Sequence, residues 1–135
     1  MKKISFFFIF LAFQLLTIPS ANAQEPANKN DNSIYNTAGI EVKPDYPGGI
    51  NEFYKFVGKN YKVPNVQGLS GKIFVSFVVE KNGKLTDIKV IRDIGYDTGK
   101  EAIRILKKCK KWSPGEQNGQ KVRVLYSLPI NIVAN

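Results

Sequence analysis

The stretch KKCKKWSPGEQNGQKVRV, residues 107–124, gathers four lysines around a cysteine and a tryptophan. Basic side chains interleaved with an aromatic one are typical of a surface that binds nucleic acid. The same residues also fit a helix that ends in lysines, tight turns through Pro-Gly and Asn-Gly, and the start of a strand. The second interpretation requires no ligand, and the rest of the chain decides between the two.

Few residues elsewhere offer catalytic or ligand chemistry. The chain contains no histidine, so the usual general base for a Ser or Cys nucleophile and the commonest transition-metal ligand are both missing. Asp87 and Asp93 fall near predicted strand ends, without a paired carboxylate for acid–base work. Gly48–Gly49 lacks the Lys-Ser/Thr of a phosphate-binding loop. We therefore expect no enzyme and no cofactor, metal or small-molecule substrate.

The first residues have the pattern of a secretory signal peptide. Lys2–Lys3 precede an apolar run, and Ala21-Asn22-Ala23 is a small-x-small cleavage site, which predicts a signal peptide over residues 1–23 and export to the periplasm. The alternative is an uncleaved inner-membrane anchor, although the apolar run is shorter than the about 20 residues that a spanning helix needs. Export argues against nucleic acid as a partner. The net charge of +9 instead favours anionic envelope surfaces and acidic proteins.

Two amphipathic helices follow a leader that we expect to be flexible over residues 24–43. The first helix buries a stripe at helical spacing: Ile50, Phe53, Tyr54, Val57 and Tyr61. In the second helix, Thr98 and Glu101 fit a capping box, and its apolar stripe is Ala102, Ile105, Leu106 and Cys109. We expect the lone Cys109 to be a buried, inert thiol and Trp112 to pack in the core.

Between the helices lies a β-hairpin. Two β-branched runs flank Asn82–Gly83, which predicts a two-residue type I′ turn with positive φ at both positions. That turn places Val75 opposite Val90, Ser76 opposite Lys89 and Val79 opposite Thr86.

A last strand follows Asn118–Gly119, and Pro129 indicates that at least its end lies at a sheet edge. The sequence thus predicts an α+β domain over residues 44–135, with two helices packed on one face of a small three-stranded antiparallel sheet. The lysines after residue 106 are then a solvated helix end.

With these elements in place, the chain resembles the TonB C-terminal domain family over Pro44–Ile132. The resemblance rests on YPGG (46–49), FVVEKNGKLTDIKVIR (77–92), EAIR (101–104) and KWSPGEQNGQKVRVLYSLPI (111–130). It implies a non-enzymatic periplasmic module that captures the TonB box, a short segment of TonB-dependent outer-membrane receptors, as a strand added beside its last strand. The resemblance assigns partner binding to Tyr46, Pro47, Arg123, Val124, Leu125, Tyr126, Ser127, Leu128, Ile130 and Ile132.

Two alternatives stay open. An exposed last strand can pair with a second copy of the chain, which would make the protein a self-associating envelope homodimer. The leader is short and not proline-rich, unlike the long spacer of full energy transducers in this family. If the signal peptide is not cleaved, the protein would be a short membrane-anchored transducer.

Overall fold

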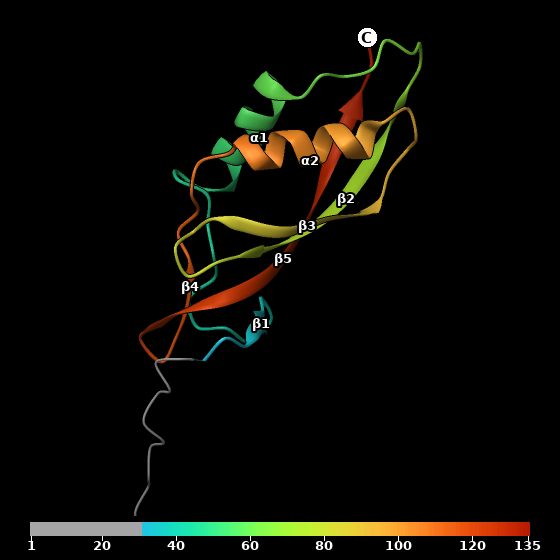
Figure 1. Cartoon of the computed structure of the whole chain (residues 1–135). Helices are drawn as coiled ribbons and strands as arrows, with labels where there is room; N and C mark the ends of the chain where they lie inside the picture. Colours follow the sequence, from blue (N-terminus) through green and yellow to red (C-terminus); the bar gives the residue numbers. More distant parts are fainter. Residues whose placement is uncertain (1–30) are drawn as a thin grey trace, which may run out of the picture.

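The computed structural model describes residues 31–135, which form two helices and a mixed five-stranded sheet (Figure 1). The predicted signal peptide lies outside the described residues. The elements in chain order are β1 (Ile34–Asn36), α1 (Ile50–Asn60), β2 (Ser70–Val79), β3 (Leu85–Arg92), α2 (Thr98–Lys108), β4 (Gly115–Gln117) and β5 (Gln120–Val133). Within residues 31–135, none of the helices has the length and apolarity that crossing a membrane demands.

The sheet has the order β1-β5-β2-β3, and β4 pairs with the start of β5. The α+β class is confirmed, and the three predicted strands are present and antiparallel, but the sheet also contains β1 and β4, which were not predicted. The segment expected to be a flexible leader contributes β1, which runs parallel to β5. Three residues give a weak periodicity signal, so this strand depends on tertiary contacts that the sequence does not display.

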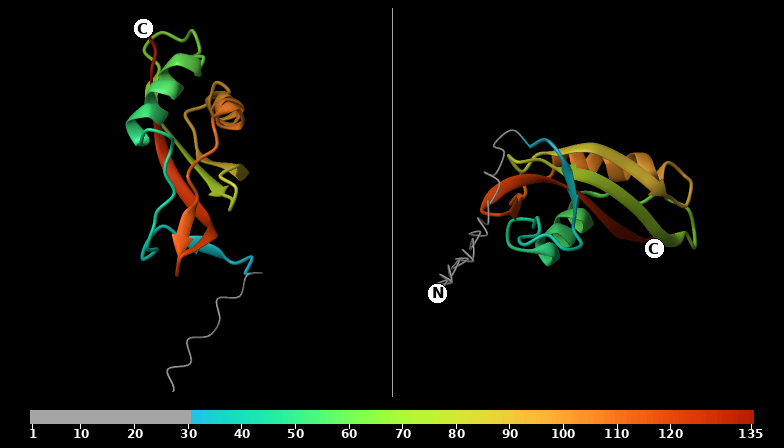
Figure 2. Two further views of the ribbon diagram at one scale, coloured as in Figure 1. Left: turned by 90° about the vertical axis from the view of Figure 1, so that its left-hand side faces the viewer. Right: turned by 90° about the horizontal axis from the view of Figure 1, so that it is seen from below.

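Both helices pack on one face of the sheet, with α1 on the β5 side and α2 on the β3 side (Figure 2). Alternating residues of β2 and β5 point into this core, and Phe53 and Val57 of α1 and Ile105 and Leu106 of α2 cover them. Burying side chains of this size stabilises the fold by about 1.5–3 kcal/mol each. The two predicted helical stripes are confirmed, except that Tyr54 is exposed.

Trp112 is the centre of the core, as the sequence predicts. It is 2% exposed, and its ring lies 5.2–5.7 Å from the rings of Tyr46, Phe53, Phe77 and Tyr126. Most of these pairs meet edge to face, the arrangement that the ring quadrupole favours. Cys109 is half-buried, and burial raises the pKa of its thiol, so it stays protonated.

The β2–β3 hairpin differs from its predicted turn. The amide of Gly83 donates to the carbonyl of Glu80, and the amide of Glu80 donates to the carbonyl of Lys84, so the loop holds three residues and only Gly83 has positive φ. This is a type I turn followed by a glycine bulge. Val79 lies opposite Leu85, not Thr86, because the loop holds three residues instead of two. The irregularity between Ser76 and Val78 then restores the predicted pairs, so that Ser76 lies opposite Lys89 and Val75 opposite Val90.

The other Asn-Gly pair forms the turn that was predicted for the first. Asn118 and Gly119 have φ of 51° and 70° and connect β4 to β5 as a two-residue loop, with Gln117 opposite Gln120. Identical dipeptides thus form different turns. At Gly83, the chain must also meet Trp112, whose amide donates to the Gly83 carbonyl over 2.9 Å.

The predicted capping box at Thr98 is wrong. The N-cap is Asp97 in the left-handed conformation, and it makes no side-chain cap. Thr98 is buried, and its hydroxyl donates to the carbonyl of Gly95, while Glu101 bonds the amide of Lys62 and the guanidinium of Arg104. Both side chains therefore tie α2 to neighbouring loops instead of closing its first turn.

Candidate functional site

β5 is paired along most of its length on one side but only partly on the other. On its inner side, β5 pairs with β2 from Val124 to Val133 without interruption. On its outer side, β1 covers Arg123–Leu125. From Tyr126 to Val133, no strand within residues 31–135 covers the outer side. The edge predicted for the end of the last strand is therefore present, and we call residues 126–133 the open edge.

The backbone groups that face outward along the open edge follow from the alternation of an antiparallel ladder. The amide of Ala134 donates to the carbonyl of Leu69, so even-numbered residues bond β2 and odd-numbered residues point away from it. The amides of Ser127, Asn131 and Val133 and their carbonyls therefore face the space beside the sheet. These are the groups that an added strand would bond.

Pro129 lies at the middle of the open edge and has no amide to offer. Because its position is one that faces outward, the missing N–H costs the β2 ladder nothing. Its carbonyl accepts the hydroxyl of Tyr54 from α1 over 2.9 Å. One side chain thus satisfies the edge at its centre, and an added strand that bonds this carbonyl must displace Tyr54.

The side chains of the open edge divide into two sets. Leu128, Ile130 and Ile132 are buried in the core, and Tyr126 is half-buried and stacked on Phe77 with ring centroids 5.6 Å apart. Burial, with smaller contributions from Asp45 and Tyr54, raises the pKa of Tyr126. Of the residues assigned to partner binding in this stretch, only Ser127 has an exposed side chain. Contact along this edge would therefore be made mainly by the backbone.

The first three residues of the assigned strand are already paired. Arg123, Val124 and Leu125 lie opposite Ile34, Tyr35 and Asn36 of β1. These three residues therefore lie outside the open edge. The sequence did not reveal β1, because that strand is short and lies in an asparagine-rich segment.

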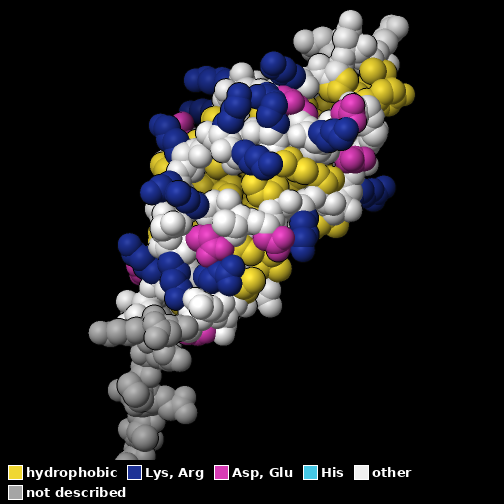
Figure 3. Space-filling model, viewed as in Figure 1, with side chains coloured by type: hydrophobic (Ala, Val, Ile, Leu, Met, Phe, Trp, Pro, Cys, Tyr) yellow, Lys and Arg dark blue, Asp and Glu magenta, His cyan; other side chains and the backbone are white. Residues whose placement is uncertain are grey.

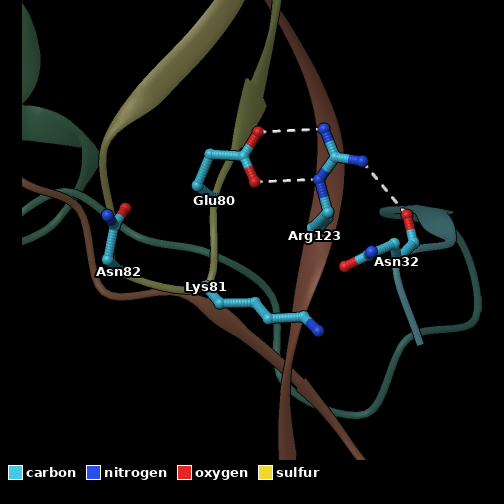
Figure 4. A pocket seen from close by; sticks show the side chains of 5 residues that line it. All are labelled: Asn32, Glu80, Lys81, Asn82 and Arg123. Carbon is cyan, nitrogen blue, oxygen red and sulfur yellow. Dashed lines mark hydrogen bonds and ion pairs between the residues drawn. The ribbon is translucent and has the colours of Figure 1, made fainter. Parts of the chain in front are cut away.

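Polar contacts hold β1 at this place (Figure 4). The guanidinium of Arg123 makes a two-pronged ion pair with Glu80, at 2.8 and 3.0 Å, and donates to the carbonyl of Asn32. Lys81 donates to the carbonyl of Asp31 over 2.6 Å. With Asn82, these side chains line an open pocket of about 520 Å³. We call Glu80, Lys81 and Arg123 the clasp.

Hydrogen bonds lower the pKa of Glu80 in the clasp and of Asp31 beside it. The Arg123 guanidinium lowers the pKa of Glu80, and the hydroxyl of Thr86 acts in the same direction. Hydrogen bonds from Ser33 and from the Tyr35 hydroxyl lower the pKa of Asp31 to about 2. Glu80 and Asp31 are therefore both ionised at neutral pH.

Tyr46 and Pro47, to which the resemblance assigns partner binding, precede α1. Tyr46 is 5% exposed and packs against Phe53 and Trp112, with ring centroids 5.5 and 5.7 Å away. Burial raises the pKa of its hydroxyl. Pro47 is exposed in the turn before α1. Tyr46 is therefore part of the core around Trp112, whereas Tyr54, which the sequence placed in the buried stripe of α1, contacts the edge of β5.

Two further features of the described residues bear on metal binding and nucleic-acid binding. Within residues 31–135, there is no group of three His, Cys, Asp or Glu side chains placed to hold a metal. Lysines and arginines are scattered over the face that carries α2, with hydrophobic surface between them (Figure 3). This distribution does not form the continuous basic stripe that tracks a phosphate backbone.

Comparison with protein families gives one match. The model for the C-terminal domain of the Gram-negative bacterial TonB protein matches residues 65–132, which run from the loop before β2 into the end of β5. The match leaves out α1, Tyr46 and Pro47, although the sequence resemblance began at Pro44. No curated protein and no solved structure matches the chain. The chain belongs to the TonB C-terminal family, whose members are non-enzymatic protein-interaction domains of the cell envelope that serve transport through outer-membrane receptors.

Proposed function

We propose that the open edge captures the TonB box of an outer-membrane receptor as an added strand. The observation that carries the proposal is the regular, one-sided pairing of β5 over Tyr126–Val133. An extended segment bonding Ser127, Asn131 and Val133 would satisfy backbone groups that otherwise face water. Each such bond contributes about 0.5–1.5 kcal/mol net, so the expected affinity is modest.

Selectivity in this proposal comes from the two rows of side chains that flank the added strand. On the helix side, the strand would meet Tyr126 and Tyr54, which favour apolar or aromatic partner residues. On the other side, it would meet Ser127 and Asn131, which favour polar ones. The net charge of +9 assists encounter with an acidic segment, an effect on the association rate that weakens with salt.

The proposed location is the periplasm, which is where a receptor presents such a segment. The predicted signal peptide over residues 1–23 supports export, and the family supports the cell envelope. With the signal removed, the protein would act as a stand-alone receptor-binding module. With it retained, the protein would be a short anchored transducer with the same binding edge.

The test is an NMR titration of the isotopically labelled full-length protein with N-terminal peptides of receptors from the same organism. We expect shifts along Tyr126–Val133 and at Tyr54. Ser127→Pro removes an outward amide and places a ring where the partner would lie, so binding should weaken about tenfold or more. Folding should be retained, because the Ser127 amide does not bond β2.

Two matched variants control this titration. Ser127→Ala changes the same side chain and keeps the amide, so it should bind normally. Leu128→Pro removes an amide that bonds β2 and should unfold the sheet. Absent shifts with every peptide, together with slow tumbling that grows with concentration, would contradict receptor capture and identify a homodimer formed through this edge.

A further inference from the structure

We propose that β1 is an end stop on the open edge, which confines an added strand to Tyr126–Val133 and so fixes its register and length. The proposal rests on strand addition at that edge, the function proposed above. Val124 pairs with Val79 of β2 and with Tyr35 of β1, so β1 lies on the outer side of β5, the side that the partner would use. The partner and β1 would therefore lie end to end on a single strand.

A three-residue strand stays in place only if side chains fix it, and here they do. The ring of Tyr35 packs against Ile40, Val122 and Val124. Its hydroxyl donates to Asp31 over 2.7 Å. The clasp then holds the carbonyls of Asp31 and Asn32 from Lys81 and Arg123. Contacts on both the apolar and the polar side make β1 part of the fold, not a tail resting on it.

The chain leaves the edge directly after β1. It turns through Thr37–Gly39, where Gly39 has φ of 79°, and then bridges to Glu116 at Val42. β1 itself occupies the outer side of Arg123–Leu125, so a partner strand cannot slide past Leu125 without displacing it. The remaining eight residues provide about 26 Å of edge.

An end stop matters because a strand edge has no intrinsic register. Shifting an added strand by one residue moves all of its side chains to the opposite face. A fixed neighbour at Leu125 removes the shifts that would carry the partner toward β4. The same partner side chains then always face Tyr54 and Tyr126, because the added strand has a single register.

The test compares the full-length protein with a variant in which β1 is released, Tyr35→Ala with Lys81→Met. Neither substitution lies on β5, and Lys84→Met in the same turn is the matched control for loss of a lysine. Protection of the β2–β5 amides from hydrogen exchange verifies that the sheet is intact. Two receptor peptides that share one core segment, of about eight and about twelve residues, are titrated into each protein.

In the unaltered protein and in the Lys84→Met control, we expect a footprint that ends at Tyr126, retained amide protection at Ile34–Asn36, and equal affinity for both peptides. In the released variant, the footprint should extend to Arg123–Leu125. The longer peptide should then bind about fivefold more tightly than the shorter one, the equivalent of about one additional net hydrogen bond.

The outcomes separate the two proposals. A footprint that covers Arg123–Leu125 in the unaltered protein, with loss of protection in β1, would show that the partner displaces β1 and would overturn the end stop alone. An unchanged footprint in the released variant would do the same. Binding of neither peptide to any of the proteins would overturn strand capture, and the end stop with it.

Discussion

Within residues 31–135, β3 and the part of β5 beyond Leu125 each have one unpaired side, and the two edges are built differently. Along β5, the ladder to β2 keeps a single register from Ser70 to Val79, so the backbone beyond Tyr126 is regular. Along β3, the ladder to β2 is broken twice in eight residues. An edge that is regular can accept another strand, whereas an edge that is bulged resists one.

Side chains reinforce this difference. In β3, Asp87 has φ of 48°, a left-handed conformation that a non-glycine residue adopts at a cost, and it forms a 3.4 Å ion pair with Lys89. Lys84 and Arg92 add charge at the two ends of the strand. Natural sheets use such charges and bulges to prevent edge-to-edge pairing. Of these two edges, the open edge of β5 is therefore the one whose backbone is regular enough to accept another strand.

The largest expected effect is on stability and concerns the turn at Gly83, which connects β2 to β3. A Cβ at Gly83 would lie 2.0 Å from the carbonyl oxygen of Trp112, in addition to the strain of φ 81°. Gly83→Val should therefore lower the free energy of unfolding by more than about 3 kcal/mol, measured by urea denaturation.

Gly119→Val is the matched control, because Gly119 has φ of 70° in the turn before β5 and open space around its Cα. Gly119→Val should lower the free energy of unfolding only by the backbone strain, about 1–2 kcal/mol. Equal losses in the two variants would show that the contact with Trp112 does not distinguish the turns.

The next largest effect is expected when the edge of β3 is made regular, like the open edge of β5. Deleting Asp87 would leave Ile88 opposite Phe77 and restore a continuous register between Thr86–Val78 and Lys89–Ser76. The β3 edge, then regular from Leu85 to Val90, should self-associate. Sedimentation velocity of the deletion in the Ser127→Pro background, where the β5 edge is blocked, should show an apparent mass that rises with concentration.

The Ser127→Pro protein without the deletion is the reference and should keep a constant mass. A constant mass in both proteins would mean that the bulge at Asp87 does not protect the edge of β3.

The smallest expected effect is on peptide affinity and concerns the hydrogen bond between Tyr54 and Pro129. Tyr54→Phe frees the carbonyl of Pro129, so an added strand no longer displaces a hydrogen bond. Receptor-peptide affinity should rise about fivefold by isothermal titration calorimetry. Tyr96→Phe, at a tyrosine that is 63% exposed, should leave affinity unchanged. Weaker binding by Tyr54→Phe would indicate that the hydroxyl contacts the partner itself.

Much of this architecture could be predicted from the sequence, because it depends on local periodicity. The helical stripes around Phe53 and Ile105, the hairpin around Gly83 and the core position of Trp112 all follow from patterns within one element. Pro129 also indicated an edge at the end of the last strand. These are the features for which residue spacing and a single residue type carry the information.

The remainder depends on contacts between distant residues. β1 forms because Tyr35 meets Val122 and Val124, and no pattern in residues 34–36 reveals that neighbour. Asn82 and Asn118 have the same following residue, but only the Gly83 turn must bond Trp112, so their loops differ. Tyr54 is exposed, contrary to its predicted place in the helical stripe, because α1 lies over the edge of β5 and its Tyr54 hydroxyl bonds the carbonyl of Pro129 there.

The parallel orientation of β1 has a mechanical consequence. A pull on the chain at Asp31, opposed by a strand bound beside Tyr126–Val133, would act along the length of β5. Such tension loads the bonds between β1 and β5 in shear, so that they resist together instead of opening one at a time from an end. In this geometry, β1 would transmit force along the sheet, with the ion pair of Arg123 and Glu80 at the point where the load enters.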